Sequence, residues 1–353
     1  MATNSAMASP IPTGPRAPAS PGLIASIGRA WDLGEIAGVI DLGGTYNLNL
    51  GLRTERGHVV LRVYRPWVRP ERLAAVQSVR EALRRDGLPV PPILPSRDGS
   101  LAVSRHHRLI EVEAWLADDG GADNLTRLRA AAGLLSRLHA GLRTAAPGSP
   151  FVPAPVSNAL APAVFDDWLA RTGRVVASVP GSAAARTAIR AHADAASIWR
   201  RARTIQRPSL PRQLVHGDYG HENVRFRGDT PSAIIDFDFL DVRERIVDLA
   251  HLAFSPHWMA PFRQLGVAPS DRDWLAVSDL IHHYDATTDR PLTAAEVAAL
   301  PVAMAMVPLT WIAASWLQED VVAAVNLVAP ELMVAGWLVE NHHELARRWA
   351  DGR

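Results

Sequence analysis

The chain of 353 residues contains no cysteine and no lysine. Without cysteine it can form neither a disulfide nor a thiolate metal site, and no thiol can serve as a nucleophile. Without lysine, every permanently positive side chain is an arginine. A site that must hold an anion with a fixed positive charge therefore has to use arginine, whose planar head is larger and less adaptable than an ammonium group.

The sequence also lacks a strong charge of either sign. Its 37 basic and 36 acidic residues leave a net charge of +1, and no block of arginines could follow a phosphate backbone. We therefore expect no nucleic acid partner and favour a small or neutral one. The absence of cysteine is compatible with a reducing cytoplasm, where we expect the protein to act.

One apolar run approaches the length of a membrane span. Residues 300–317, LPVAMAMVPLTWIAASWL, are interrupted by Pro308, Thr310 and Ser315, and acidic residues follow at once. A span needs about 20 apolar residues with few polar interruptions. We predict a buried helix of a soluble domain and no membrane partner.

The pattern of apolar residues divides the chain into three parts. Residues 1–22 are rich in alanine, proline and serine and read as a disordered tail. Residues 23–115 combine short alternating runs, typical of strands, with a helical pattern that ends before Gly87. Residues 116–353 are mostly helical, except for two short strands around a loop between Leu214 and Phe239. We expect a small sheet-rich lobe followed by a larger helical lobe that holds these two short strands.

The segment LVHGDYGHENVRF, residues 214–226, carries the chemistry. Asp218 follows Gly217, which permits a tight turn, and Asn223 lies five positions later in the same loop. Asp236 ends the apolar run that follows, where a strand would deliver a second carboxylate. A carboxylate that accepts a hydroxyl proton, with an amide oxygen and a second carboxylate for a hard cation, is the set that phosphoryl transfer from a nucleotide requires.

Three motifs, HGDYGHENV, AIIDFDF and VDLAHLA, lie in this order over about forty residues. Together they resemble the aminoglycoside phosphotransferase and choline kinase-like branch of the protein-kinase-like fold. The resemblance implies an α+β, bilobal fold with a small β-rich N-lobe that binds the nucleotide and a larger helical C-lobe. That C-lobe would hold the catalytic loop and the acceptor pocket. It also implies Asp218 as catalytic base, Asn223 and Asp236 as Mg²⁺ ligands, His216 as a loop-ordering residue and Asp248 as a buried organiser of the loop.

The first lobe should contain the nucleotide-binding residues. Gly43, Gly44 and Thr45 look like the nucleotide loop of that family, where glycine lets backbone N–H groups approach phosphates. In the strand VVLRVY, alternation puts Val60 and Arg62 on one face. Arg62 stands where the family has lysine or arginine, and the resemblance implies that it grips the phosphates.

Two features of this lobe are less regular. The acid that the family places on the following helix would fall near Gln77, so either Glu81 takes its role or Arg62 is held by Gln77 and the phosphates. By analogy, Glu113 and Ala114 should lie near the hinge between the lobes and offer backbone groups to adenine.

These observations predict an ATP (or GTP)-dependent, Mg²⁺-dependent O-phosphotransferase. Its acceptor would be a hydroxyl of a small molecule, an antibiotic or a natural-product intermediate. Two alternatives stay open: a catalytically silent relative that binds nucleotide or peptide as a partner subunit, and a kinase of serine or threonine in a biosynthetic peptide.

Overall fold

The computed structural model describes residues 16–44, 46–145, 158, 160–205, 209–254 and 275–351. These residues form two compact units. The first contains the described residues up to Gln77 together with Pro91–Trp115, and the second contains Ser78–Val90 and the described residues from Leu116 onward. Helix α2 (Pro70–Arg85) contributes to both units.

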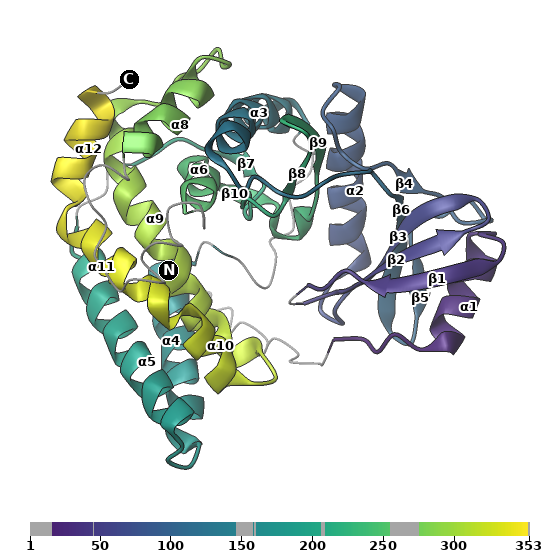
Figure 1. The fold of residues 1–353 in the computed structure, drawn as a ribbon, viewed down its shortest axis with the longest axis horizontal. Helices are drawn as coiled ribbons and strands as arrows, with labels where there is room; N and C mark the ends of the chain where they lie inside the picture. Colours follow the sequence, from purple (N-terminus) through teal and green to yellow (C-terminus); the bar gives the residue numbers. More distant parts are fainter. Residues whose placement is uncertain are drawn as a thin grey trace, which may run out of the picture. The chain divides into compact units, whose positions relative to one another are not determined.

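A six-stranded antiparallel sheet forms the first unit (Figure 1). Its path is β1-β2-β3-β6-β4, and β5 also pairs with β6. The strands are β1 (Ile36–Asp41), β2 (Leu48–Thr54), β3 (Gly57–Val63), β4 (Ile93–Leu94), β5 (Val103–Arg105) and β6 (Arg108–Ala114).

The two faces of this sheet differ in chemistry. One face is apolar, because alternate residues of β2, β3 and β6, such as Leu50, Leu61 and Val112, form a buried cluster. Helix α1 (Pro21–Ala30) covers this face and adds Ile27 to the cluster. The alternate positions project to the opposite face, which therefore carries the polar residues of β3 and β6.

Helix α1 begins inside the segment that we expected to be a tail. Ser20 caps the helix by accepting a hydrogen bond from the N–H of Leu23, and Pro21 occupies the first turn, where its missing N–H costs nothing. Arg16 binds Asp41 on β1 through both guanidinium nitrogens. The sequence pattern thus placed the start of the ordered chain too late, and residues 1–15 lie outside the described part.

Helices dominate the second unit. Helix α9 begins with a complete capping box between Thr293 and Glu296 and is buried along most of its length, as predicted for residues 300–317. The helices are α3 (Leu125–Thr144), α4 (Pro162–Ser178), α5 (Ala183–Ala202), α6 (Ile246–Ala253), α8 (Leu275–Asp285), α9 (Ala294–Ala314), α10 (Val321–Val328), α11 (Leu332–Glu340) and α12 (His342–Asp351).

Four short strands of this unit form two separate antiparallel pairs. Strand β7 (Arg212–Val215) pairs with β10 (Asp241–Glu244), and β8 (Val224–Arg227) pairs with β9 (Thr230–Ile234). The prediction of one pair of strands around the loop was wrong. The loop after β7 leads to β8, which belongs to a different sheet. Strand β7 pairs with β10, which follows Asp236 in the chain.

Two stretches are long and apolar enough to cross a membrane by length and composition, Ala294–Leu317 and Val321–Glu340. Of their apolar windows, 72% and 50% respectively are buried inside the fold. Burial against neighbouring helices accounts for the apolar character of the first stretch, as in the core helix of a globular domain.

Candidate active site

The loop of residues 216–223, hereafter the catalytic loop, connects β7 to β8. Gly217 has a φ of +80°, and a Cβ atom there would lie 2.3 Å from the carbonyl oxygen of Phe239. No other residue fits this position without moving the backbone of the neighbouring segment. The glycine therefore fixes the turn that presents Asp218.

Asp248 on α6 anchors the beginning of this loop. Its carboxylate accepts hydrogen bonds from the backbone N–H groups of His216 and Gly217, each 2.8 Å long, and contacts Nε2 of His139 at 3.0 Å. Burial alone would raise the pKa of Asp248, but the hydrogen bonds and the nearby His139 hold the pKa below its usual value. Asp248 is therefore buried and holds the backbone at the start of the loop, and its role as an organiser of catalysis stays a prediction.

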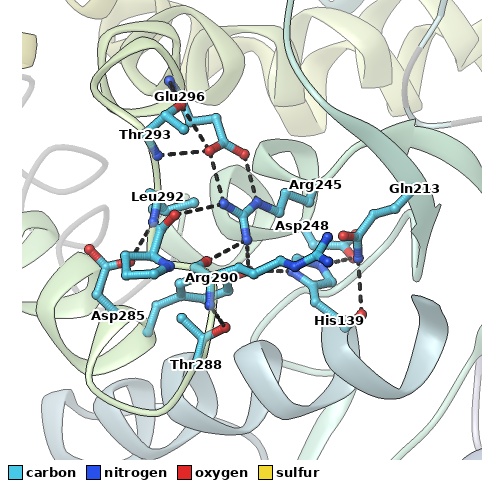
Figure 2. A network of polar contacts seen from close by, with 12 residues as sticks. His139, Gln213, Arg245, Asp248, Asp285, Thr288, Arg290, Leu292, Thr293 and Glu296 are labelled. Atoms are coloured by element: carbon cyan, nitrogen blue, oxygen red, sulfur yellow. Dashed lines mark hydrogen bonds and ion pairs between the residues drawn. The ribbon is translucent and has the colours of Figure 1, made fainter. Parts of the chain in front are cut away.

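A network of buried polar contacts extends from this anchor (Figure 2). Nδ1 of His139 lies 2.8 Å from the hydroxyl of Tyr284, which also contacts Arg245 at 3.3 Å. Arg245 in turn binds both carboxylate oxygens of Glu296, the acid of the α9 capping box, at 2.6 and 2.9 Å. The anchor of the catalytic loop is thus tied to helices α3, α8 and α9.

Asp218 is held by side chains on both sides of its carboxylate. Nδ2 of Asn223 donates to the backbone carbonyl of Asp218 at 2.7 Å and to its Oδ2 at 3.1 Å, while Asn158 donates to Oδ1 at 2.8 Å. Nδ1 of His251 on α6 lies 3.6 Å from Oδ1. The Asp218 side chain nevertheless keeps 24% of its surface exposed, so an acceptor molecule can reach it.

The pKa values around Asp218 reflect a crowded, partly dehydrated site. Burial, followed by the negative charge of Asp236, raises the pKa of Asp218 well above its usual value. Burial lowers the pKa of His251 to about 4 and also lowers that of His216. Both imidazoles are therefore neutral at physiological pH and supply no positive charge to the carboxylates.

Asp236 lies immediately beyond β9 in a left-handed conformation, with φ 65° and ψ 62°. This conformation is uncommon for a residue with a side chain and costs conformational energy. The backbone next to it is fixed, because Ile235 donates its N–H to the carbonyl of Asn223 at 2.9 Å and its carbonyl contacts Nε2 of His216 at 3.0 Å. His216 thus links the loop to the segment that carries Asp236, as a loop-ordering residue would.

The residues expected to hold a divalent cation fit that group. Asp218 and Asp236 interact as like charges, which a hard cation would relieve. Because Asn223 uses its amide nitrogen toward Asp218, its amide oxygen is the atom suited to a cation. Within the described ranges, no cluster of three or more His, Asp or Glu side chains could hold a metal alone. Few protein ligands are typical of Mg²⁺, which retains waters and shares phosphate oxygens.

The glycine loop of the first unit has the backbone that phosphate binding requires. Gly43 and Gly44 both have positive φ, and a Cβ atom at Gly44 would lie 2.5 Å from Nδ2 of Asn49. Arg16 donates to the carbonyl of Gly43 at 3.0 Å, and Asp41 accepts from the N–H of Gly43 at 2.8 Å. The hydrogen bond to Arg16, more than any other contact, lowers the pKa of Asp41 to about 2. Thr45, the third predicted loop residue, lies outside the described residues.

Arg62 lies on the polar face of the sheet and is buried, with 5% of its surface exposed. Its direct neighbour across the β3–β6 ladder is Glu111, which sequence reasoning missed. Glu111 accepts hydrogen bonds from the hydroxyl of Tyr64 at 2.7 Å and from Nε2 of Gln77 at 2.8 Å. Gln77, one of the two proposed partners, belongs to this group, hereafter the arginine cluster (Arg62, Tyr64, Gln77 and Glu111).

Glu81, the other proposed partner of Arg62, engages different residues. Its side chain is 44% exposed and binds Arg84 on the surface of α2 through two hydrogen bonds of 2.9 Å. The suggestion that Glu81 replaces the helix acid is therefore not supported by its contacts.

The last three predicted nucleotide-binding residues lie on strands paired inside the sheet: Val60 on β3, and Glu113 and Ala114 on β6. Val60 faces Glu113 across the β3–β6 ladder, and Glu113 also pairs with Ile93 of β4. The N–H of Ala114 donates to the carbonyl of Pro92 at 2.9 Å. In this arrangement the Ala114 N–H is already used within the sheet, so its contact with adenine remains a prediction.

Several residues of the site carry no recognisable sequence signal. His139 and His251 occupy apolar-looking helical positions, and Glu111 reads as one charge in the alternating strand RLIEVEA. Arg62 and Glu111 lie opposite each other because of the register between β3 and β6, and the sequence pattern does not determine that register. The one signal in the sequence was the absence of an acid near Gln77 on the helix. That absence indicated that Arg62 must have another partner.

Comparisons with known proteins extend these observations. Residues 33–280 match the family model described as the phosphotransferase enzyme family. The homoserine kinase of Beijerinckia indica subsp. indica is 31% identical over 267 residues, which cover 73% of this chain and 73% of that protein.

Two solved structures have the same fold at low sequence identity. A microcompartment-associated aminopropanol kinase superposes with a TM-score of 0.65 at 17% identity, covering 92% of this chain and 98% of that chain. An amicoumacin kinase in complex with AMP-PNP, Ca²⁺ and its ligand superposes with a TM-score of 0.61 at 14% identity, covering 88% and 92%.

Proposed function

We propose that this chain uses ATP and Mg²⁺ to phosphorylate a small amino-bearing alcohol, with homoserine as the first acceptor to test. The chain belongs to the phosphotransferase enzyme family and is a phosphotransferase acting on a hydroxyl group. The protein-kinase-like α+β fold predicted from the sequence is confirmed by the likeness to solved structures. The substrate, the cation and the roles of single residues are the proposed part.

One observation carries the proposal. Asp218 lies on a loop whose backbone is anchored by Asp248, its carboxylate is held by Asn223, and the negative charge of Asp236 acts on it. A base that is rigid and reachable, beside an amide oxygen and a carboxylate suited to a cation, is the arrangement that phosphoryl transfer to a hydroxyl needs. A purely structural loop would gain nothing from two carboxylates that repel each other.

In the proposed mechanism, Asp218 accepts a hydrogen bond from the acceptor hydroxyl, orients its oxygen and takes up its proton. The acceptor oxygen bonds to the γ-phosphorus of ATP while the bond from that phosphorus to the bridging oxygen breaks, and ADP leaves. Asn223 and Asp236 would hold the cation, which when bound neutralises charge on the phosphate oxygens. Arg62 and the N–H groups of the loop at Gly43 would hold the nucleotide phosphates. Ionisation of Asp218 is favoured once its negative neighbour, Asp236, is neutralised.

The choice of acceptor rests on the curated relatives. The protein that is 31% identical over 73% of both chains is a homoserine kinase, and the superposed aminopropanol kinase also takes a small amino alcohol by its name. A short, primary alcohol with an amino group is therefore our first expectation, ahead of a polycationic antibiotic or a peptide. The lack of cysteine agrees with action in the cytoplasm, where we place the enzyme.

The test is a direct assay of ADP release with MgATP and a panel containing homoserine, aminopropanol, choline, an aminoglycoside and a serine peptide, with mass spectrometry of each product. We expect the highest kcat/KM for homoserine or aminopropanol. In Asp218→Asn, kcat should fall by a factor of about 10³, because general base catalysis is lost while nucleotide binding is retained. ATP binding without ADP release for any acceptor would contradict the proposed substrate class.

A matched control is Asp279→Asn, which neutralises an acid on α8 that pairs with Arg129. Its kcat should stay close to that of the unmodified chain. If both variants lost activity equally, a general effect of removing charge, rather than loss of the base, would explain the result.

A further inference from the structure

The side chain that would grip phosphate, Arg62, is buried on the polar face of the first unit. Taking a guanidinium out of water is costly unless a negative group compensates it. Kinase-like folds are expected to supply that group from the helix after the strand, but α2 offers only two acids. Glu71 is exposed, and Glu81 is bound to Arg84 at the surface. The compensating carboxylate must therefore come from another element.

Glu111 on β6 meets this requirement. It is fully buried and stands directly opposite Arg62 in the antiparallel ladder. Residues opposite each other in such a ladder project to the same side of the sheet, with Cβ atoms about 5 Å apart. A fully buried carboxylate opposite a buried guanidinium is expected to be its electrostatic partner.

The surrounding contacts fix the orientation of Glu111. One carboxylate oxygen accepts from the hydroxyl of Tyr64 at 2.7 Å, and the other accepts from Gln77 at 2.8 Å. The guanidinium carbon of Arg62 lies 5.5 Å from the centre of the Tyr64 ring, within the range of a cation–π contact. Four side chains, from β3, the residue that follows it, α2 and β6, thus share one buried polar cluster. Gln77 occupies the helix position at which an acid was expected.

We propose that Glu111 is the positioning residue for Arg62: the carboxylate that orients the phosphate-binding arginine has moved from helix α2 to strand β6, and Gln77 joins the helix to it by a neutral hydrogen bond. This inference rests on the proposed nucleotide-dependent function. It has a mechanical consequence, because the Arg62–Glu111 relation is set by strand register. The arginine therefore stays oriented without a charged contact from the helix.

The main test is a double-mutant cycle on nucleotide affinity. Binding of AMP-PNP with Mg²⁺ is measured by calorimetry for the unmodified chain, Glu111→Gln, Arg62→Met and the double variant. We expect Glu111→Gln to weaken binding by about tenfold to a hundredfold, the range of a charge-assisted contact. In the Arg62→Met background the same change should have no further effect, because Glu111 acts through Arg62.

A charge relocation separates positioning from general support of the fold. The double variant Gln77→Glu with Glu111→Gln moves the carboxylate to the helix and keeps the total charge. We expect it to regain most of the nucleotide affinity and the KM for ATP lost in Glu111→Gln. The matched control, Glu81→Gln, removes the surface acid of the same helix and should leave both quantities unchanged.

The outcomes are distinct. A folded Glu111→Gln variant that binds nucleotide as tightly as the unmodified chain overturns the inference alone, as does equal loss from Glu111→Gln in both Arg62 backgrounds. Should Glu111→Gln fail to fold, the comparison of Arg62→Met with the double variant, in which neither charge is left uncompensated, decides instead. An unmodified chain that binds no nucleotide at all would overturn the proposed function as well.

Discussion

The arginine cluster and the catalytic loop are both built from buried charges, but they balance those charges differently. In the first unit, Glu111 stands opposite Arg62, so a negative and a positive group occupy the same buried face. In the second unit, the negative charge of Asp236 acts on Asp218, and the histidines next to the loop are held neutral by burial. In the first region the chain itself supplies charges of both signs, whereas in the second an added cation would offset the charge of the two aspartates.

This difference indicates in which of the two regions a bound cation would raise the free energy of unfolding. A balanced pair contributes to the folded state with or without ligand, although removing one partner is costly. Two like carboxylates oppose folding until something neutralises them, and that cost is released as binding energy for a cation. The electrostatic strain of the second unit therefore lies at the candidate active site.

The largest effect is expected at the anchor of the catalytic loop. Asp248→Ala leaves the N–H groups of His216 and Gly217 and the ring of His139 without their acceptor, all in a buried place. The free energy of unfolding should fall by about 3–5 kcal/mol, as for other broken buried pairs. Urea unfolding followed by circular dichroism measures it.

The control for this prediction is Asp279→Ala, which removes a partly exposed acid paired with Arg129. A pair of that kind contributes at most about 1 kcal/mol. Similar losses in the two variants would mean that Asp248 is no anchor, and that the loop is held by its other contacts.

The next effect concerns acid sensitivity, which should arise in the second unit. Burial lowers the pKa of His251 from 6.5 to about 4. As the pH falls from about 6.5 to about 4, the unfolded chain takes up a proton at this residue and the folded chain does not. The contribution of His251 to the free energy of unfolding therefore falls by about 3 kcal/mol over this window, at 1.36 kcal/mol per pKa unit.

Urea unfolding at a series of pH values tests this effect in His251→Asn, which should lose stability less steeply between pH 6.5 and 4. His216, whose pKa is shifted in the same direction, leaves part of the slope in place. His107→Asn serves as control, because His107 is exposed. An identical pH dependence in the unmodified chain and in His251→Asn would show that His251 is not buried in its neutral form.

The contrast between the two regions also explains which parts could be predicted from the sequence. Asp218, Asn223 and Asp248 belong to motifs whose contacts are set by a short loop and by backbone N–H groups, so the resemblance of these motifs to a family was enough to point to them. Glu111 is 49 positions from Arg62, and their apposition depends on the β3–β6 register. No local pattern encodes such a register, because a slip of one residue would put the acid on the other face.

Fold prediction failed for a similar reason around the catalytic loop. The strand pattern near Leu214 and Phe226 is correct, but β7 pairs with β10 and β8 pairs with β9. Short strands with few apolar residues carry little information about their partners. The helical elements were easier, because amphipathic spacing in α3 and α5 lies within one segment.

The smallest effect is expected at the glycine loop, where the charges are partly exposed. Arg16→Ala removes the contacts to Asp41 and to the carbonyl of Gly43. Because partly exposed pairs contribute little, the KM for ATP should rise by no more than about fivefold, and less at high salt. Steady-state kinetics measure this, with Arg56→Ala, which breaks the exposed pair with Asp32, as control. An effect as large as that of Glu111→Gln would reverse the ranking of the two contacts.

The central claim is that Asp218 and Asp236 repel each other until a cation is bound, and the stability of Asp236→Asn tests it most directly. Urea unfolding is compared with the unmodified chain, first with a chelator and then with Mg²⁺ and AMP-PNP at about 100 times the dissociation constant. We predict that Asp236→Asn is at least as stable as the unmodified chain under chelation. With Mg²⁺ and AMP-PNP, the unmodified chain should gain about 2.7 kcal/mol and become the more stable of the two. If Asp236→Asn were less stable under chelation and gained as much from Mg²⁺ and AMP-PNP, the two carboxylates would not form a cation site.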